Sequence, residues 1–201
     1  MNFQRQFKFY ASHRNQLLLD KCACLHGHRY EVTYYLEMNR SRTSGNSGDV
    51  TVLFSDLDFI DSSIRKHFDH ACLLDVSDPL GRVLIDFAKF DPSGPFWKFV
   101  ITRFPTSAEN LAFVMFDSIL SLIKKSGLDV LLKSIQIRET DSTLVSYNHD
   151  DWMDDWAYLQ SFSTIPYRSR NLYLAPSLSN LQNMVQYLTE NQFPAESFLT
   201  T

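Results

Sequence analysis

Residues 26–36 read His-Gly-His-Arg-Tyr-Glu-Val-Thr-Tyr-Tyr-Leu, and this alternation decides the fold. Every second position from His26 to Leu36 holds a histidine or a large apolar or aromatic residue, and side chains two apart share one face of a β-strand. An upstream segment keeps the same period through Phe7, Phe9, Ala11 and His13. The pattern predicts two strands whose core-facing sides carry three histidines: His13, His26 and His28.

Three imidazoles on one face match a catalytic zinc site, which takes three protein ligands and keeps a fourth position open for water or substrate. A structural zinc site would normally be closed by a fourth protein ligand. Any one of these histidines alone is more often a hydrogen-bonded strand residue than a metal ligand. The spacing of His26 and His28 and the matching phase of His13 are independent coincidences. Together they favour a metal site.

The composition is that of one globular domain. With 201 residues, 44% of them hydrophobic and 14% aromatic, the chain can bury a sizeable core. A formal net charge of −4 argues against a nucleic-acid-binding protein, which would carry a basic surface. No apolar run is long enough to span a membrane, and the first residues are polar rather than signal-like. Three cysteines, Cys22, Cys24 and Cys72, make no disulfide framework, so we expect a cytoplasmic protein.

The order of patterns along the chain predicts an α+β fold. Strands are expected at about 3–12 and 28–38, with a third at about 49–54 that completes a hairpin. A helix is expected to start at Ser55 and to bury one stripe of residues: Leu57, Ile60, Ile64 and Phe68. Its end would place an acid and a histidine side by side, at Asp69-His70.

The second half of the chain predicts a further hairpin, a long helix and two short strands. Apolar runs at 82–87 and 97–101 flank a turn rich in Pro and Gly and predict the additional hairpin. Residues 106–109, Thr-Ser-Ala-Glu, form a capping-box pattern that opens a helix through about Lys125. Strands are expected at 134–140 and 144–147. In the first of them, Glu139 shares a face with two isoleucines, which is costly unless the carboxylate has a partner.

The chain changes character after Asn148. An acidic and aromatic segment at 149–156 is followed by a helix expected at about 177–189. The segment could bind a partner, but buried tryptophan contributes much apolar area, so packing of its tryptophans on the domain is favoured. We therefore expect a domain at 1–148, with the additional hairpin at about 76–103, and a C-terminal extension at 149–201.

Five short motifs, in order, resemble the 6-pyruvoyltetrahydropterin synthase superfamily. They are Phe-x-Ala-Ser-His at 9–13, Cys-x-x-x-His-Gly-His-x-Tyr at 22–30, Asp-His-x-x-Leu at 69–73, Pro-Thr-x-x-Glu-Asn-Leu-Ala at 105–112 and Glu-Thr at 139–140. The three residues between Cys22 and His26 resemble the 6-carboxytetrahydropterin synthase branch, because the pyruvoyl enzymes typically have a longer spacing there. The resemblance covers residues 3 to about 148.

The resemblance implies a tunnelling fold, in which a four-stranded antiparallel sheet carries two helices on one face. Sheets of several subunits join edge to edge into a barrel, and the active sites form between subunits. The implied assembly is a homo-oligomer, a hexamer built as a dimer of trimers. The resemblance also implies a role for each matched residue: zinc ligands His13, His26 and His28, catalytic base Cys22, proton relay Asp69 with His70, and pterin anchor Glu139, with Thr106 bordering the pterin pocket.

The implied reaction converts 7,8-dihydroneopterin triphosphate to 6-carboxy-5,6,7,8-tetrahydropterin, acetaldehyde and triphosphate, on the route to 7-deazaguanines such as queuosine. Zinc would act as a Lewis acid, and a thiol beside it would have a lowered pKa. The pyruvoyl synthase reaction, which eliminates triphosphate, is the first alternative. A non-catalytic zinc-binding assembly protein is the second, and the presence of Cys22, Asp69, His70 and Glu139 speaks against it.

Several residues keep a structural alternative. Cys24 lies near enough to replace Cys22 as the base or to be a fourth zinc ligand, but the spacing favours Cys22 and makes Cys24 a packed thiol. Asp69-His70 alone would more often be a helix terminus with favourable dipole electrostatics than a relay. The triphosphate has four nearby candidate partners: Arg14, Lys21, Arg29 and Lys66.

Overall fold

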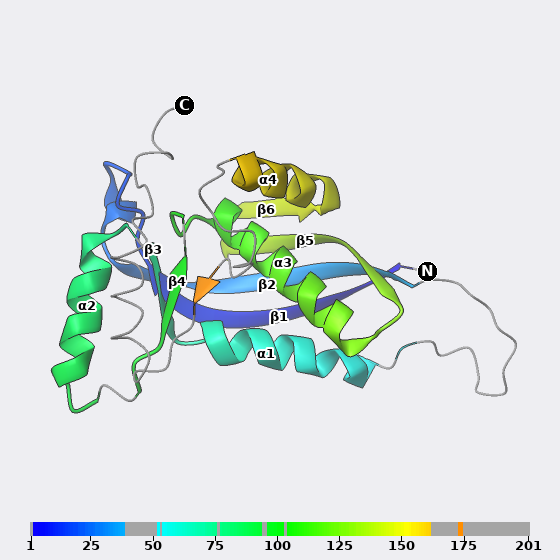
Figure 1. Cartoon of the computed structure of the whole chain (residues 1–201), viewed down its shortest axis with the longest axis horizontal. Coiled ribbons are helices and arrows are strands. Elements are labelled where there is room, and N and C mark those ends of the chain that lie inside the picture. The colour runs from blue at the N-terminus through cyan, green and yellow to red at the C-terminus, as the bar shows by residue number, and fades with distance from the viewer. Residues whose placement is uncertain are drawn as a thin grey trace, which may run out of the picture.

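The computed structural model describes residues 2–38, 52, 54–75, 77–93, 96–102, 104–161 and 173–174. Within these residues the strands form one seven-stranded sheet in the order β6-β5-β2-β1-β3-β4-β7 (Figure 1). Four neighbouring strands are antiparallel: β1 (Asn2–His13), β2 (His26–Met38), β5 (Val130–Thr140) and β6 (Thr143–Asn148). The resemblance implies a sheet of four antiparallel strands, whereas here these four strands are part of a larger sheet.

The rest of the sheet was not expected. β3 (Ala71–Asp75) runs parallel to the end of β1, and β4 (Phe99–Thr102) runs parallel to β3. A two-residue strand, β7 (Tyr173–Leu174), pairs antiparallel with β4. The α+β class is therefore confirmed, but the expected sheet is too small, because a parallel unit extends it beyond β1.

In the described part of the chain, four α-helices surround this sheet (Figure 1). α1 (Asp58–Phe68) and α3 (Ala108–Ser126) pack on the antiparallel strands, while α4 (His149–Ser161) lies against α3 and β6. α2 (Pro79–Phe90) connects β3 to β4. Two 3-10 turns, η1 (Lys21–Ala23) and η2 (Phe54–Leu57), precede β2 and α1.

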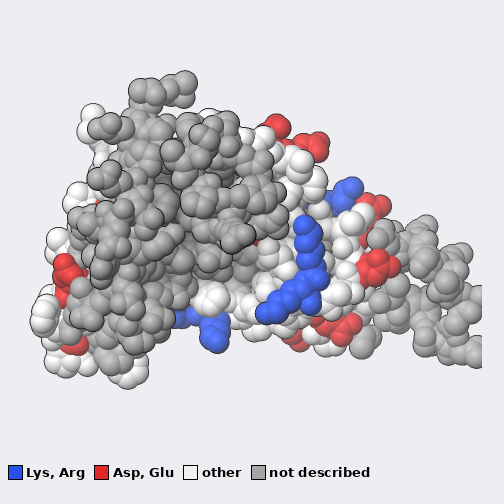
Figure 2. Space-filling view, in the orientation of Figure 1, with Lys and Arg blue, Asp and Glu red and all other residues white. Residues whose placement is uncertain are grey.

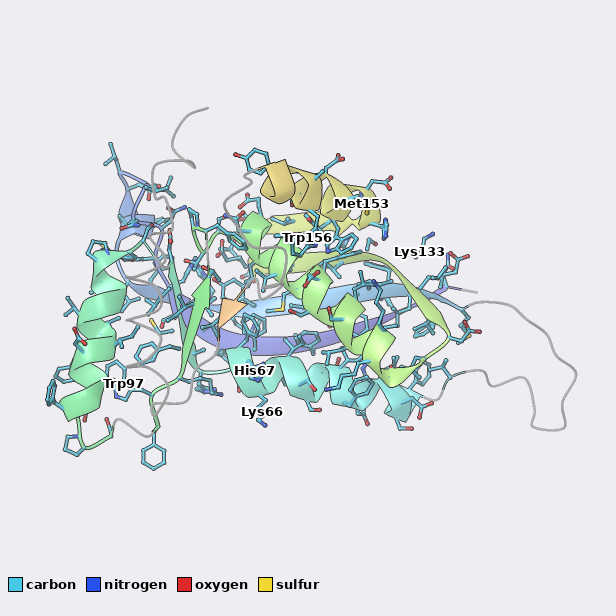
Figure 3. All side chains as sticks on the ribbon, in the orientation of Figure 1. Lys66, His67, Trp97, Lys133, Met153 and Trp156 are labelled. Atoms are coloured by element: carbon cyan, nitrogen blue, oxygen red, sulfur yellow. The ribbon has the colours of Figure 1, made fainter. Side chains whose placement is uncertain are left out.

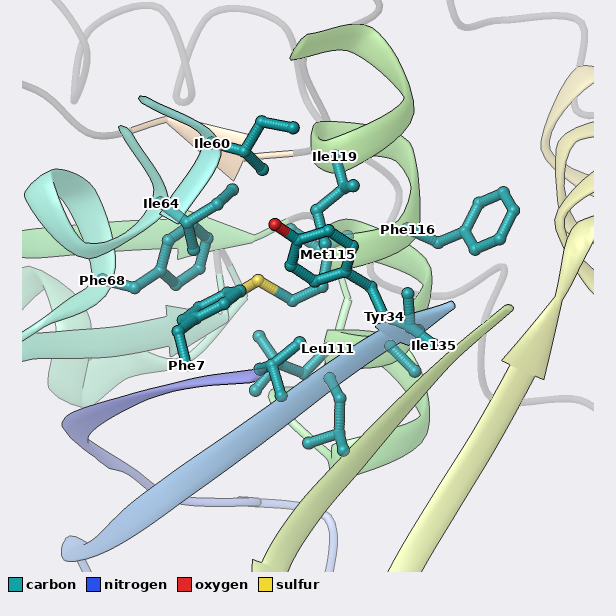
Figure 4. Packing of buried hydrophobic residues seen from close by; sticks show 14 of the residues in the cluster. Phe7, Tyr34, Ile60, Ile64, Phe68, Leu111, Met115, Phe116, Ile119 and Ile135 are labelled. Atoms are coloured by element: carbon teal, nitrogen blue, oxygen red, sulfur yellow. The ribbon is translucent and has the colours of Figure 1, made fainter. Parts of the chain in front are cut away.

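The main core lies between the antiparallel strands and the two helices α1 and α3 (Figure 4). Phe7, Tyr34 and Ile135 reach into it from three neighbouring strands, and Ile64 and Met115 reach into it from the helices. Each of these five side chains is at most 1% exposed. Because side chains alternate along a strand, this core fixes which face the remaining residues of β1 and β2 occupy.

Most expected elements are confirmed. The strands predicted at 3–12 and 28–38 are β1 and β2, and the predicted stripe Leu57, Ile60, Ile64 and Phe68 is buried. The long helix is α3, and Gly127 follows it with a left-handed φ of 72°. The strand expected at 49–54 falls largely outside the described residues, and Phe54 opens η2 instead. The helix expected at 177–189 lies wholly outside them.

The favoured packing of the C-terminal tryptophans is also confirmed. Trp152 and Trp156 on α4 pack against the main core, and Figure 3 shows Trp156 between α4 and α3. Both indole N–H groups donate to Oδ1 of Asp117 on α3, at 3.1 and 3.3 Å. α4 is thereby fixed to the domain by apolar contact and by a shared hydrogen-bond acceptor.

The hairpin predicted at 76–103 is wrong, because residues 82–87 belong to α2 rather than to a strand. The residues that favour a helix over a strand lie at the start of α2. The side chain of Asp78 accepts a hydrogen bond from the backbone N–H of Leu80, and Pro79 occupies the first turn. Ile85 and Ala88 then lie one helical turn apart and are buried against β3 and β4. The segment is a β-α-β unit with parallel strands, which needs a crossover rather than a tight turn.

The surface of the described part carries both signs of charge. Figure 2 shows Lys and Arg side chains with Asp and Glu side chains near them on this face. None of the helices in the described ranges is long and apolar enough to cross a membrane. The cluster of His13, His26 and His28 is therefore the candidate functional site.

Arg5 connects β1 to α1 through a buried acid. Its Nε donates to Oδ2 of Asp61 at 2.7 Å, and the hydroxyl of Tyr34 donates to Oδ1 of the same carboxylate at 3.0 Å. Asp61 is only 7% exposed. Arg5→Ala would leave this carboxylate short of a donor, so we expect the free energy of unfolding to fall by about 1–3 kcal/mol in urea denaturation.

The matched control for Arg5 is Lys8, three residues further along β1. Lys8 pairs with Glu31 at 3.0 Å, but its side chain is 46% exposed. We expect Lys8→Ala to cost less than about 1 kcal/mol, because exposed ion pairs contribute little. Equal losses from the two variants would contradict the special role of the buried acid.

Candidate active site

The register of β1 and β2 brings the three histidines together. His13 lies opposite His26, and Ala11 lies opposite His28. Since residues two apart share a face, the three imidazoles point to the same side of the sheet. The ring centroids are 4.7 Å apart for His13 and His26, 5.2 Å for His13 and His28, and 4.8 Å for His26 and His28. One ligand nitrogen of each ring lies within 4.8 Å of the others, so the group could hold a metal ion.

Hydrogen bonds to backbone carbonyls orient two of the rings. Nδ1 of His13 lies 2.6 Å from the carbonyl oxygen of Thr106, and Nδ1 of His26 lies 2.7 Å from that of Cys24. Because a carbonyl can only accept, each Nδ1 carries the proton and each Nε2 keeps its lone pair for a ligand. Among the described residues, Nε2 of His13 is a buried nitrogen that makes no hydrogen bond. A metal ion would satisfy this nitrogen, so the residues present fit a metal.

The protonation of the cluster also suits a metal. Burial is the main cause that lowers the pKa of His13, and the neighbouring imidazoles act in the same direction. Burial likewise lowers the pKa of His28, with a further contribution from His26. The charge of Glu139 opposes both shifts without reversing them. At neutral pH these two side chains are therefore in the neutral form that binds metals.

Glu139 lies beside the cluster, as its position in an apolar row suggested. Its Oε1 is 3.4 Å from Nε2 of His13 and 4.0 Å from Nε2 of His28. The same oxygen accepts a hydrogen bond from the hydroxyl of Tyr30 at 3.1 Å. Burial, followed by the charge of Glu139, raises the pKa of Tyr30, so this hydroxyl remains a donor. Tyr30 is a site residue that the sequence reasoning missed, although it continues the row of His26 and His28.

Cys22 lies at the centre of η1, on the loop between the two histidine strands. Its backbone N–H donates to Oδ1 of Asp20 at 2.7 Å, and its side chain is half-buried. Burial, followed by the negative charge of Asp20, raises the pKa of the Cys22 thiol, and Glu139 adds to this rise. The positive charge of Lys21 opposes this rise in the pKa of Cys22 without reversing it.

The sequence predicts that Cys24 is a packed thiol. This prediction is wrong, because Cys24 is exposed. Its contribution to the site comes from the main chain, through the carbonyl that accepts the proton of His26 Nδ1. The third cysteine, Cys72, lies on β3, where burial raises the pKa of its thiol. Cys72 is half-buried and packs beside the buried residues of α2 and β4.

Asp69 and His70 lie together at the end of α1, as predicted. Nδ1 of His70 is 3.0 Å from Oδ2 of Asp69, and His70 has a left-handed φ of 59°. The backbone N–H of Tyr10 donates to Oδ1 of Asp69 at 2.9 Å. Partial burial opposes the shift, but this N–H and the His70 ring lower the pKa of the Asp69 carboxyl. The carboxylate is therefore ionised and can hold the imidazole.

The Asp69-His70 pair does not meet the histidine cluster within one chain. The ring of His70 lies 6.1 Å from the ring of Tyr10. Tyr10 and His13 are three positions apart on β1, so their side chains point to opposite faces of the strand. A single chain therefore presents the metal cluster on one face and the acid–histidine pair on the other.

Thr106 has a different local role from the one the capping-box pattern predicts. The cap of α3 is Ser107, whose Oγ accepts from the N–H of Asn110 at 3.4 Å. The hydroxyl of Thr106 instead donates to the carbonyl oxygen of Arg14 at 3.0 Å, while its own carbonyl orients His13. Thr106 is 3% exposed, so it supports the histidine cluster from its buried side.

Paired strands carry three imidazoles that could hold a metal ion, with a carboxylate beside them, in an α+β protein. A sequence profile of the family described as 6-pyruvoyl tetrahydropterin synthase matches residues 2–150, and the chain belongs to this family of lyases.

The chain is also similar to individual proteins. The chain is 29% identical over 96 residues to a 6-carboxy-5,6,7,8-tetrahydropterin synthase of Synechocystis, which covers 45% of this chain and 74% of that protein. A crystal structure of an uncharacterized protein from Wolinella succinogenes superimposes with a TM-score of 0.57 at 23% identity, covering 74% of this chain and 98% of that one. This likeness shows a shared fold. The 6-pyruvoyl tetrahydropterin synthase of Caenorhabditis elegans gives a TM-score of 0.44 at 21% identity, covering 74% of this chain and 94% of that one.

Proposed function

We propose that this chain is a zinc-dependent lyase that converts 7,8-dihydroneopterin triphosphate and one water to 6-carboxy-5,6,7,8-tetrahydropterin, acetaldehyde and triphosphate, as a step towards 7-deazaguanines such as queuosine. The observation that carries the proposal is the cluster of His13, His26 and His28, in which a buried nitrogen of His13 has no hydrogen-bond partner among the described residues. The name of the Synechocystis relative and the three-residue spacing from Cys22 to His26 support the carboxy reaction over the pyruvoyl one.

Each side chain has a task that follows from its surroundings. His13, His26 and His28 hold the zinc, which supplies Lewis acidity to the side-chain hydroxyls of the substrate. Glu139 accepts two hydrogen bonds from the amino and N–H edge of the pterin, and the Tyr30 hydroxyl keeps that carboxylate in place. Cys22 removes a proton from the substrate side chain. Its thiol becomes acidic enough only when the positive charge of the metal offsets Asp20 and Glu139.

The proton relay of Asp69 and His70 requires a second chain. The pair lies on the face of β1 away from the histidine cluster, so it serves the site of a neighbouring subunit. The free edges of the sheet support such an assembly. In the described part of the chain, β1 pairs with β3 only at Ala11 and Ser12, which leaves residues 2–9 with β2 alone, and β6 is the outermost strand on the other side. We propose a homo-oligomer joined through these edges, a hexamer built as a dimer of trimers.

The remaining assignments follow the same reasoning. The catalytic domain comprises residues 1–148, and 149–201 form an extension that begins with α4. All three cysteines are free, which supports a reducing compartment such as the cytoplasm. Free thiols are also what the proposed chemistry needs, because a disulfide at Cys22 would remove the base.

Product analysis tests the proposal. The zinc-loaded protein is incubated with 7,8-dihydroneopterin triphosphate, and pterins are separated by chromatography while acetaldehyde is trapped as a hydrazone. We expect acetaldehyde and 6-carboxytetrahydropterin in equal amounts, and none from metal-free protein. Pyruvoyl-pterin without acetaldehyde would replace the carboxy reaction with the pyruvoyl one. Zinc binding without any product would favour a non-catalytic assembly protein.

A further inference from the structure

The β3–α2 connection reaches the loop that carries Cys22 through one buried ion pair. Nε of Arg14 donates to Oδ2 of Asp78 at 2.7 Å, and Nη2 of Arg14 donates to Oδ1 at 2.6 Å. Asp78 is 3% exposed, so the pair is shielded from water on the carboxylate side. Two parallel hydrogen bonds between a guanidinium and a carboxylate fix both distance and orientation. The contact joins α2, which the sequence reasoning missed, to the residue next to His13.

Two other groups of Arg14, its Nη1 and its backbone carbonyl, also make hydrogen bonds at the loop. Its Nη1 donates to the carbonyl oxygen of Ala23 at 3.4 Å, beside Cys22. Its own carbonyl oxygen accepts from the hydroxyl of Thr106, the residue that orients His13. The next residue, Asn15, donates its backbone N–H to the carbonyl oxygen of Cys22 at 2.8 Å. Arg14 is thus in contact with both ends of the loop and with the support of the metal cluster.

Among the described residues, apolar packing contributes little to the position of the loop. Leu17, Leu18 and Leu19 are 48%, 43% and 104% exposed, so they contribute little apolar packing. A second polar contact comes from the same connection, where Nε2 of Gln16 donates to Oγ of Ser77 at 3.0 Å. A segment with few buried apolar contacts opens easily, and its position depends on such hydrogen bonds.

The pairing of Arg14 also decides against a direct role in triphosphate binding. Nε and Nη2, two of its three donor nitrogens, are already satisfied by a buried carboxylate, and the Asp78 hydrogen bonds raise the pKa of Arg14. A phosphate could take these donors only by leaving Asp78 buried and unpaired, which is costly. Arg14 therefore acts on the reaction through the loop rather than through the substrate.

We propose that Arg14 and Asp78 form a clamp that positions the Cys22 loop beside the three-histidine cluster. Both are positioning residues, and α2 is the element that supplies the anchor. The catalytic part of this proposal rests on the proposed function, whereas the loop's dependence on the clamp does not.

Asp78→Asn is the sharpest test, because asparagine caps a helix as well as aspartate does and α2 should persist. In the zinc-loaded protein we expect faster hydrogen exchange at the amide of Asn15 and faster alkylation of Cys22 by iodoacetamide, both mapped by mass spectrometry. Metal content and KM should be unchanged. Misplacement of a reacting group should lower kcat on the order of 10- to 100-fold.

Further variants separate the effect of the clamp from an effect on general stability. Asp91→Asn removes a carboxylate that bonds Ser93 and Trp97 at the other end of α2, and it should leave the loop unchanged. Arg14→Lys keeps the charge but loses the two-point contact, so it should reproduce the Asp78→Asn effects in part. The double variant Arg14→Gln with Asp78→Asn should be no worse than Arg14→Gln alone, because paired residues are not additive.

The proposal is overturned if exchange at Asn15 and alkylation of Cys22 are the same in Asp78→Asn, Arg14→Lys and the unaltered protein. It is also overturned if Asp91→Asn loosens the loop as much as Asp78→Asn does. A failure of the proposed function looks different, since the unaltered protein would then make no product while the exchange and alkylation results still decide the clamp.

Discussion

Replacement of His13 by alanine is expected to abolish both stoichiometric metal binding and turnover. The imidazole supplies one of three ligands, and its Nε2 is the buried atom without a hydrogen-bond partner in the described structure. Loss of an outer-shell partner already weakens metal affinity by roughly 10- to 100-fold, and loss of a ligand should exceed that range. Metal content after dialysis, measured by mass spectrometry of the element, should fall from about one ion per chain to near zero.

Two variants make this result specific. His28→Ala removes a ligand that is less buried than His13, so it should lose the metal with less risk to folding. His149 lies on α4, where its ring packs 5.4 Å from that of Trp152, and His149→Ala should keep the metal. Full metal occupancy in both His13→Ala and His28→Ala would contradict the assignment of the cluster as a metal site.

The position of the cluster could be predicted because it follows from alternation alone. Once Phe7 and Phe9 are buried, His13 must occupy the same face of β1, and the row from His26 to Leu36 places the other two histidines on the same face of β2. The register that sets His13 opposite His26 is not encoded in either strand separately. The buried core and the shared face of the strands were sufficient to predict, without the register, that the three histidines lie together.

Other parts of the site could not be predicted because they depend on contacts distant in sequence. The partner of Glu139 is Tyr30, 109 residues away, and the partner of Arg14 is Asp78, 64 residues away. The apolar run at 82–87 fits a buried strand and a buried helix equally well, and periodicity over so few residues does not separate them. The cap and proline at 78–79 were the signal that could have identified α2.

Under the proposed function, one chain is an incomplete catalyst. The histidine cluster lies where the end of β1 pairs with β2, whereas Asp69 follows α1 and accepts a hydrogen bond from the backbone N–H of Tyr10. The ring of His70 lies 6.1 Å from that of Tyr10, and the side chains of Tyr10 and His13 point to opposite faces of β1. Assembly through sheet edges would solve this problem and would also remove unpaired strand edges.

Replacement of Cys22 by alanine is expected to lower kcat by about 100- to 10,000-fold while the metal stays bound, because a positioned acid–base group contributes that much. The thiol is not one of the three ligands in the cluster, so metal content should not change. Cys24→Ala is the matched control. It removes the neighbouring thiol but keeps the main-chain carbonyl that orients His26, so activity should change little.

The pH dependence of Cys22 alkylation gives an independent measure of its role. In the metal-free chain, burial and the charges of Asp20 and Glu139 raise the pKa of this thiol, so thiolate and alkylation should appear only in alkaline solution. Zinc adds positive charge beside it, and the alkylation profile should then shift to lower pH. A profile that zinc leaves unchanged, or a Cys22→Ala protein that turns over normally, would remove Cys22 as the base and leave the proton abstraction to the Asp69-His70 pair of a neighbouring chain.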